Sequence, residues 1–457
     1  MHFAQHYLDC LSQAAYVIGD PTTGRAVVVD PRRDVDDYVA DAEEHGFTVE
    51  AVINTHFHAD FLAGHLELAE RTGAWIGYGH RAETEYSIRG LADGERISLG
   101  EVTLQIMETP GHTPESISIL VFEHPDDAIP YGVLTGDALF VGDVGRPDLL
   151  ASTGVTAREL GSMLYDSVHR KLLALPDATR VFPAHGAGSA CGKNLSAERS
   201  STIGEQRRTN YACRPMDEET FVALVTAGQS VAPGYFSYDA DLNRRNRDLY
   251  DAGQAAPALG VEEFGALRAG GALVLDARDQ LAFAAGHLAG SVNVPIEGRF
   301  AEQAGSVLTP ADEILVIAPR GREQETVTRL ARIGFDRAVG YAADPEEVFL
   351  AHPDRMRQAG RVTVDTLRAE LASTQPPLVL DVRNCRERAD GRRIEGALHI
   401  PLAELAGRLD EVPAEGRLIV HCAGGHRSSI AASLLRQRGR AEVYDLLGGY
   451  GAWETAA

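Results

Sequence analysis

The sequence predicts an α/β protein made of three consecutive domains, and two observations carry this prediction. Apolar runs typical of buried strands recur along the chain, and several of them lead into histidine or aspartate residues. In the second half, the run that begins at Leu273 recurs at Leu378, 105 residues further on, which indicates a duplicated domain. A length of 457 residues suits about three domains of ordinary size.

The composition narrows the function classes. A net charge of −23 argues against nucleic acid or an anionic membrane surface as a partner. No run approaches the ~18 apolar residues of a membrane span, and the start, Met1–His6, lacks a basic region followed by an apolar one. We therefore expect a cytoplasmic protein. The five cysteines are scattered and form no Cys-x-x-Cys, so neither a disulfide framework nor a zinc knuckle is predicted.

The segment Thr55–Phe61 is the most informative motif of the first domain. It follows a strand-like run, Val49–Asn54, and contains His56, His58 and Asp60. Because α/β folds bind ligands beyond the carboxyl ends of their strands, these three side chains are candidate metal ligands.

Three further strand-like runs each lead into a candidate ligand. His112 follows the run 102–107, and Asp137 and His185 follow two later apolar runs. A single histidine or aspartate is usually a capping, buried or solvated residue. Several in order, each after a strand, indicate a metal site.

These motifs together resemble the metallo-β-lactamase fold, an αββα arrangement whose His-x-His-x-Asp-His motif serves two metals. In this sequence the last position of the motif is Phe61. A phenyl ring has no lone pair for a metal, so the second site keeps Asp60 and whatever else converges there. A two-metal hydrolase is therefore disfavoured.

Within that fold the chain resembles the persulfide dioxygenases. The resemblance implies one Fe(II) per chain, held by His56, His112 and Asp137. Two imidazoles and one carboxylate leave iron with open positions for O₂ and a sulfur substrate, whereas zinc, which has no redox chemistry, suits hydrolysis. His58, Asp60 and His185 then support the ligands, and a direct ligand role for the two histidines stays open.

The substrate side of this site is less defined. Arg146 matches the arginine with which these enzymes hold a carboxylate of the thiol carrier, a task that suits a guanidinium fork. The glutathione-using members have a tyrosine shortly after the last motif histidine, which the segment Gly186–Lys193 lacks. Another carrier such as coenzyme A is therefore an alternative to glutathione. Lys193 could meet its acidic groups, and Cys191 is a candidate sulfur acceptor or a small packed residue.

Three domain ranges follow from these patterns. The metal domain is expected over 1–250, with arginine-rich helices in its tail, and residues 251–257 are expected to form a linker. The two copies of the repeat are expected over 258–352 and 360–457.

Both copies resemble rhodanese domains, small α/β domains with an active loop between a strand and a helix. In the second copy a strand leads into Cys422, and the loop carries two glycines and Arg427 before a helix over 428–438. Backbone N–H groups, the helix N-terminus and Arg427 would stabilise a thiolate and then a persulfide on Cys422. The first copy has Ala318 at this place, so it is predicted to be degenerate.

The combined resemblance implies an enzyme that oxidises a low-molecular-weight thiol persulfide with O₂ to sulfite and transfers sulfane sulfur through Cys422. The expected partners are the thiol persulfide, O₂, sulfite and thiosulfate, with further copies of the chain in a homo-oligomer and neither nucleic acid nor membrane. Two alternatives stay open: a glyoxalase II-like thioester hydrolase carrying a rhodanese sulfurtransferase module, and a sulfur carrier that needs only Cys422.

Overall fold

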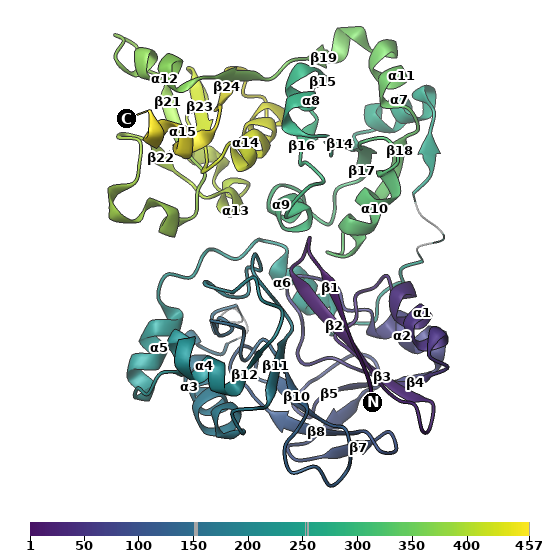
Figure 1. Ribbon diagram of the computed structural model, residues 1–457. Helices are drawn as coiled ribbons and strands as arrows, with labels where there is room; N and C mark the ends of the chain where they lie inside the picture. The colour runs from purple at the N-terminus through teal and green to yellow at the C-terminus, as the bar shows by residue number, and fades with distance from the viewer. Residues whose placement is uncertain (150–153, 252, 254–255, 457) are drawn as a thin grey trace. The chain divides into compact units, whose positions relative to one another are not determined.

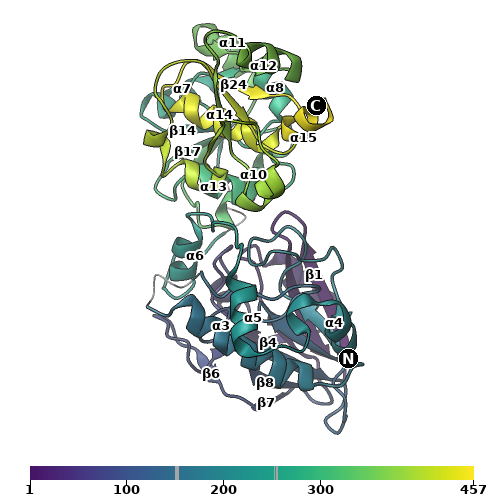
Figure 2. The ribbon, with the colours of Figure 1, turned by 90° about the vertical axis from the view of Figure 1, so that its left-hand side faces the viewer.

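A computed structural model describes residues 1–149, 154–251, 253 and 256–456 (Figures 1 and 2). The chain forms two compact units: Met1–Gln229 with Phe236–Asp251, and Ser230–Tyr235 with Ala252–Ala457. Three positions of the expected linker, 252, 254 and 255, and the last residue of the third expected domain, 457, lie outside the described residues. The exact bounds of the three expected domains stay a prediction.

Two six-stranded sheets form the centre of the first unit. The first sheet has the order β1-β2-β3-β4-β5-β6 and the second the order β12-β11-β10-β9-β8-β7. The strands of the first are β1 His2–Leu8, β2 Gln13–Asp20, β3 Arg25–Val29, β4 Thr48–Ile53, β5 Trp75–Gly79 and β6 Arg89–Leu91. Those of the second are β7 Arg96–Ser98, β8 Thr103–Glu108, β9 Ile117–Phe122, β10 Gly132–Gly136, β11 Arg180–Pro183 and β12 Ser201–Thr202.

The two sheets pack face to face, and helices cover their outer faces. Alternate strand residues such as Ile18 and Ile53 meet Leu104 and Ile119 in one buried cluster between the sheets. The opposite face of the first sheet packs against α1 Asp36–Glu44 and α2 His65–Thr72. The second sheet is covered by α3 Ala157–Tyr165, its continuation Asp166–Ala174, α4 Ile203–Thr209 and α5 Glu218–Thr226, and α6 Phe236–Leu242 follows. This is the predicted αββα arrangement.

The second unit contains two parallel sheets with the same topology. Their orders are β13-β18-β17-β14-β16 and β20-β24-β23-β21-β22, so each strand of one has a counterpart in the other. The first comprises β13 Ala258–Leu259, β14 Leu273–Asp276, β16 Val292–Asn293, β17 Ile314–Ile317 and β18 Ala338–Ala342. The second comprises β20 Gly360–Val362, β21 Leu378–Asp381, β22 Leu398–His399, β23 Leu418–His421 and β24 Val443–Leu446.

Helices flank both of these sheets (Figure 1). Those of the first copy are α7 Val261–Ala269, α8 Gln280–Ala285, α9 Phe300–Val307, α10 Glu323–Ala331 and α11 Pro345–Ala351. Those of the second are α12 Val364–Leu371, α13 Leu402–Leu405, α14 His426–Gln437 and α15 Gly449–Thr455. A two-stranded ribbon pairs β15 His287–Leu288 with β19 Met356–Arg357. Across the described residues, no helix has both the length and the apolar character needed to span a membrane.

Candidate functional site

His56, His112 and Asp137 come together at the ends of three strands in the first unit. His56 follows β4, His112 lies between β8 and β9, and Asp137 directly follows β10. One donor atom of each residue lies within 4.8 Å of the other two, and all three side chains are buried. The Oδ2 atom of Asp137 is 3.5 Å from His112 Nε2 and 3.8 Å from His56 Nε2.

The buried polar atoms of this group fit a cation. Among the described residues, neither His56 Nε2 nor Asp137 Oδ2 has a hydrogen-bond partner, although both are buried. The Nδ1–H of His112 can donate to the carbonyl of Arg146 at 2.9 Å, which directs the Nε2 lone pair toward Asp137. Because unpaired buried polar atoms are costly, and because two imidazoles with one carboxylate suit iron or zinc, this donor set fits a metal ion.

The charge states of these groups suit metal binding. Burial lowers the pKa of His56 well below its ordinary value, and it also lowers the pKa of His112, so both imidazoles are neutral donors. Burial alone would raise the pKa of Asp137, but His185, His56 and His112 outweigh it and hold that pKa well below its usual range. The carboxylate is therefore ionised.

Asp30 anchors the histidine motif and was missed in the sequence. It directly follows β3, and its Oδ1 and Oδ2 atoms accept hydrogen bonds from the amide and hydroxyl of Thr55 at 2.7 and 2.8 Å. Thr55 Oγ1 lies 2.9 Å from His56 Nδ1, and His58 Nε2 lies 3.1 Å from Asp30 Oδ1. One carboxylate thus orients both histidines. The signal that could have found it is the one used elsewhere, a carboxylate at the end of an apolar run.

Asp60, His185 and Cys191 form a second buried group, with donor atoms within 4.8 Å of one another. His185 bridges two carboxylates, since its Nε2 lies 2.8 Å from Asp60 Oδ2 and its Nδ1 lies 2.7 Å from Asp137 Oδ1. Burial would lower the pKa of His185, but Asp137 and Asp60 outweigh burial and hold it well above its ordinary value. Burial, followed by Asp60 and Asp137, raises the pKa of the Cys191 thiol well above its ordinary value.

Phe61 occupies the position where the motif of the resembling fold has a histidine. The ring is fully buried, with its centroid 4.3 Å from the His58 ring and 6.5 Å from the His185 ring. Its apolar edge therefore borders the second donor group without adding a ligand.

The two cations expected to meet the carrier are both engaged within the protein. Arg146 forms two 2.7 Å contacts with the carboxylate of Asp148 and donates to the carbonyl of Ala190. Lys193 Nζ donates to the carbonyls of Leu224 and Ala227. The structure thus ties Arg146 to the metal group through its backbone carbonyl, and the carrier-binding roles of Arg146 and Lys193 stay predictions.

The loop around Cys422 in the second unit forms a separate site. Cys422 follows β23, its side chain is buried, and its Sγ accepts a hydrogen bond from the amide of Gly425 at 3.1 Å. Ser428 Oγ lies 3.6 Å from the same sulfur. The helix expected from Ser428 begins two residues earlier, at His426, so its first turn directly follows the loop. The Gly425 amide and the N-terminus of this helix favour an anion on the sulfur.

Arg427 is held by Glu387, a residue that the sequence did not single out. The guanidinium forms two contacts of 2.7 and 2.6 Å with the two carboxylate oxygens. Burial alone would raise the pKa of Glu387, but Arg427 outweighs it and lowers that pKa below its usual value. Glu387 lies in the segment between β21 and β22, where no pattern marks it, so only the folded chain brings it to the loop.

The protein families that match this chain fall in different units of the structure. Residues 8–185 match the family described as Metallo-beta-lactamase superfamily, and residues 261–343 and 363–456 each match the Rhodanese-like domain. A crystal structure of a metallo-beta-lactamase from Staphylococcus aureus subsp. aureus COL is 33% identical, has a TM-score of 0.67, and covers 74% of this chain and 98% of its own. The chain belongs to the metallo-beta-lactamase superfamily. The predicted fold class, with rhodanese-like sheets after the metallo-β-lactamase fold, is confirmed.

Curated relatives of this metallo-β-lactamase superfamily protein differ in the activities that they are named for. The Beta-lactamase hydrolase-like protein of Xylella fastidiosa is 31% identical over 254 residues, which are 49% of this chain and 54% of the relative. The mitochondrial Persulfide dioxygenase ETHE1 of Homo sapiens is 29% identical over 196 residues, which are 43% of this chain and 69% of the relative. The chain thus spans about half the length of the first curated relatives that it matches.

The first rhodanese-like domain has no thiol at the position that corresponds to Cys422. Ala318 directly follows β17 and is buried. Cys385 of the other rhodanese-like domain is exposed and lies in a short helical segment. Among the described residues of these two domains, the buried thiol in a strand-to-helix loop is that of Cys422.

Proposed function

We propose that the first unit oxidises the sulfane sulfur of a low-molecular-weight thiol persulfide with O₂ at a single Fe(II), and that Cys422 transfers sulfane sulfur. The observation that carries the first part is the group of His56, His112 and Asp137, whose buried donor atoms converge while Phe61 supplies no ligand beside it. Two imidazoles and one carboxylate leave open positions on Fe(II) for both reactants.

The reaction balances with one water. A persulfide R–S–SH, O₂ and H₂O give R–SH and sulfurous acid, so the terminal sulfur is oxidised and O₂ is reduced. When bound, the iron supplies the redox chemistry between sulfur and O₂. The chain itself supplies neutral imidazole donors, an ionised Asp137 and the Asp30 contacts that fix His56 and His58. Either glutathione or coenzyme A could serve as the carrier R.

Cys422 is proposed to act as the nucleophile of sulfur transfer. Its thiolate attacks the outer sulfur of thiosulfate, which releases sulfite and leaves a persulfide on Cys422 that a thiol can then accept. The Gly425 amide at 3.1 Å would stabilise the anionic sulfur before and after this step. Arg427, held by Glu387, adds positive charge beside the loop for the anionic donor.

One experiment tests both assignments together. Freshly purified protein is analysed for metals under anaerobic conditions and then assayed for persulfide-dependent O₂ uptake and for thiosulfate sulfurtransfer. We expect about one iron per chain and loss of both iron and O₂ uptake in His112→Ala and Asp137→Ala, because one of three protein ligands is removed. Cys422→Ser should keep the O₂ uptake and lose sulfurtransfer, and the metal-ligand variants should show the opposite.

Two outcomes overturn this proposal. Two zinc ions per chain together with thioesterase activity would replace the oxidation reaction, and unchanged sulfurtransfer in Cys422→Ser would remove the sulfur-transfer assignment. Loss of O₂ uptake in Cys422→Ser despite normal iron content would show that the two sites do not act separately.

One observation favours a thioester hydrolase as a second candidate. Asp60, His185 and Cys191 place three donor atoms within 4.8 Å of one another beside Asp137. Such a group could hold a second metal even without a ligand at position 61, and two metals suit hydrolysis. Zinc-loaded protein assayed with acyl thioesters of glutathione and coenzyme A distinguishes the candidates, because a persulfide dioxygenase should leave both thioesters intact.

A further inference from the structure

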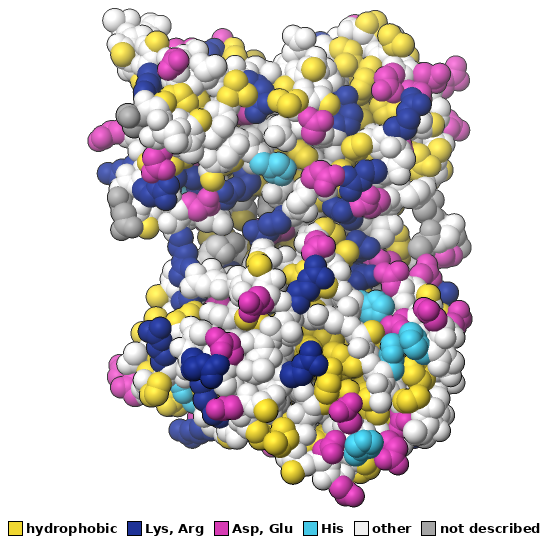
Figure 3. Space-filling model, viewed as in Figure 1, with side chains coloured by type: hydrophobic (Ala, Val, Ile, Leu, Met, Phe, Trp, Pro, Cys, Tyr) yellow, Lys and Arg dark blue, Asp and Glu magenta, His cyan; other side chains and the backbone are white. Residues whose placement is uncertain are grey.

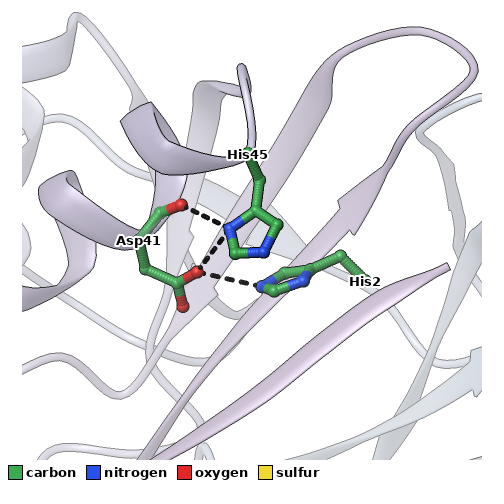
Figure 4. Close-up of side chains that lie close together, drawn as sticks. All are labelled: His2, Asp41 and His45. Carbon is green, nitrogen blue, oxygen red and sulfur yellow. Dashed lines mark hydrogen bonds and ion pairs between the residues drawn. The ribbon is translucent and has the colours of Figure 1, made fainter.

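We propose that His2, His45 and Asp41 form a binding site for a divalent transition-metal ion at the surface of the first unit, and that this ion is zinc. The three residues come from two elements. His2 lies on β1, Asp41 on α1, and His45 directly follows the last residue of α1. Their donor atoms lie within 4.8 Å of one another. Figure 4 shows His2 Nε2 directed at the carboxylate, and His45 Nδ1 close both to this carboxylate and to the backbone carbonyl of Asp41, at 2.9 Å from the latter. A metal ion on His45 Nδ1 would replace this contact with the carbonyl.

The geometry is close to that of a metal site. His2 Nε2 and His45 Nδ1 both lie 3.0 Å from the same oxygen, Asp41 Oδ1. In a tetrahedral zinc site with bonds of about 2.0–2.1 Å, neighbouring ligand atoms are about 3.3 Å apart. A small opening of these contacts would therefore admit the ion. Imidazole and carboxylate together are ligands that zinc and its neighbours accept.

The charge of Asp41 has no arginine or lysine to balance it among the ion pairs described for this residue. Its side chain is 11% exposed, and its recorded ion-pair partners in the described residues are three histidines: His2, His6 and His45. The neighbouring acids of the same helix, Asp36 and Asp37, contact Arg71 and Arg32 instead. A carboxylate that is nearly buried among imidazoles offers a bound cation both charge and donor atoms.

His6 holds the other side of the carboxylate. Its Nε2 lies 2.7 Å from Asp41 Oδ2, the oxygen that the other two histidines leave open. His2 and His6 are four residues apart on one strand, so their side chains lie on the same face of the sheet. This contact fixes the carboxylate with Oδ1 toward His2 and His45, which is the role that outer contacts play in metal sites.

The two imidazoles are also positioned by ring packing, and the site is open to solvent. Their ring centroids are 4.0 Å apart, and the Phe47 ring lies 5.9 Å from the His45 ring in a stacked arrangement. The side chains of His2 and His45 are 19% and 41% exposed, so an ion and a water ligand can reach them. Figure 3 shows histidine side chains at the surface of this unit in the region of α1.

Equilibrium dialysis of the untagged full chain against Zn²⁺ tests the site, with zinc per chain as the measurement. The Asp137→Ala/His185→Ala background removes a ligand from each of the two buried groups, so the remaining tight zinc reports the surface site. We expect this background to bind one zinc that raises its melting temperature, and His2→Ala and His45→Ala added to it to abolish both effects. His6→Ala should weaken binding about 10- to 100-fold.

His124→Ala is the matched control. His124 is also a surface histidine, with its Nδ1 3.3 Å from Glu101, but this pair lacks a second imidazole. Its removal should leave zinc binding unchanged. Asp41→Asn keeps the size of the side chain and should lose the zinc while circular dichroism stays native, which covers the case of a misfolded histidine variant. Equal zinc content and affinity in Asp41→Asn and its parent would overturn the proposal.

Discussion

The backbone amide of Asn293 donates a hydrogen bond to Ser433 Oγ at 2.9 Å and so joins the two rhodanese-like domains of the second unit. Asn293 ends β16 of the copy that carries Ala318, whereas Ser433 lies in α14, the helix that follows the Cys422 loop. Ser429 of the same helix lies 3.3 Å from Asn293 Oδ1. The copy without a thiol therefore packs against the helix on which the thiol loop of the other copy depends.

Ser433→Ala tests this contact. The substitution leaves the buried amide of Asn293 without its acceptor, which costs about 1–3 kcal/mol of unfolding free energy. We expect urea denaturation to show this loss, and sulfurtransfer to fall because α14 carries the Cys422 loop at its start. Ser373→Ala, at an exposed position after α12, should change stability by less than about 0.5 kcal/mol. Equal stability of the two variants would mean that the contact is not needed.

Two adjacent glycines of the Cys422 loop should respond differently to alanine. Gly425 has φ +96° and donates its amide to the sulfur, so a side chain there strains the backbone that holds the anion. A non-glycine residue in this region costs about 1–2 kcal/mol, which predicts a loss of about 5- to 30-fold in sulfurtransfer if the strain is relieved by moving the loop. Thiosulfate-dependent kinetics measure this loss.

Gly424 is the control for that experiment. Its φ lies outside the left-handed region, and an added Cβ would meet no atom within 4 Å. Gly424→Ala should therefore keep near-normal activity. A similar loss in both variants would show that the loop tolerates no side chain at all. It would contradict a specific role of the Gly425 amide in holding the Cys422 sulfur.

The sequence predicted the elements of both sites better than their internal contacts. Strand-end motifs located His56, His112 and Asp137 because a strand rich in buried residues leaves an apolar run before each of these residues. Cys191 could not be placed in this way, since it lies near Asp60 and His185 only because its loop folds back, with the Arg146 amide donating to its carbonyl. Such proximity depends on tertiary packing and leaves no periodic pattern.

The loop motif of the second unit shows the same limit. Cys422 and Arg427 stand close together in the sequence, whereas Glu387 approaches Arg427 from a segment 40 residues earlier. The sequence likewise marks Arg146 as a candidate for binding a carboxylate of the carrier. Its pairing with Asp148 is visible only once the loop is folded. Side chains that pair across loops escape pattern-based prediction.

We expect the unfolding free energy of the protein to depend on pH because of the buried side chain of His421. Burial lowers its pKa to about 4, with Asp381 opposing and Arg383 and Arg388 reinforcing the shift. An unfolded histidine titrates near about 6.5, so the unfolded state binds more protons between about pH 6.5 and 4. The free energy of unfolding is therefore not reduced by His421 above about pH 6.5. It falls by about 3 kcal/mol as the pH decreases toward 4.

The measurement compares the wild type with His421→Gln by urea denaturation from pH 7 to pH 4. Glutamine does not titrate. The unfolding free energy of the wild type should therefore fall by about 3 kcal/mol relative to that of the variant as the pH decreases from 7 to 4. A difference that stays constant with pH would show that His421 is already charged, or exposed, in the folded protein.

Phe61→His should allow the first unit to bind one more metal. The Phe61 ring is fully buried beside the group of Asp60, His185 and Cys191, so an imidazole there would bring a lone pair to three existing donors. We expect zinc excess to raise the metal content by one ion per chain relative to the parent. The His45→Ala background is used throughout, since it removes the proposed surface site from the count.

Phe61→Leu is the control for this experiment, because leucine keeps the position apolar, and it should bind as much metal as the parent. If the parent already binds two zinc ions, or if Phe61→His binds no more than Phe61→Leu, then the phenyl ring does not limit the metal number, and the argument for a single-metal dioxygenase loses its main support.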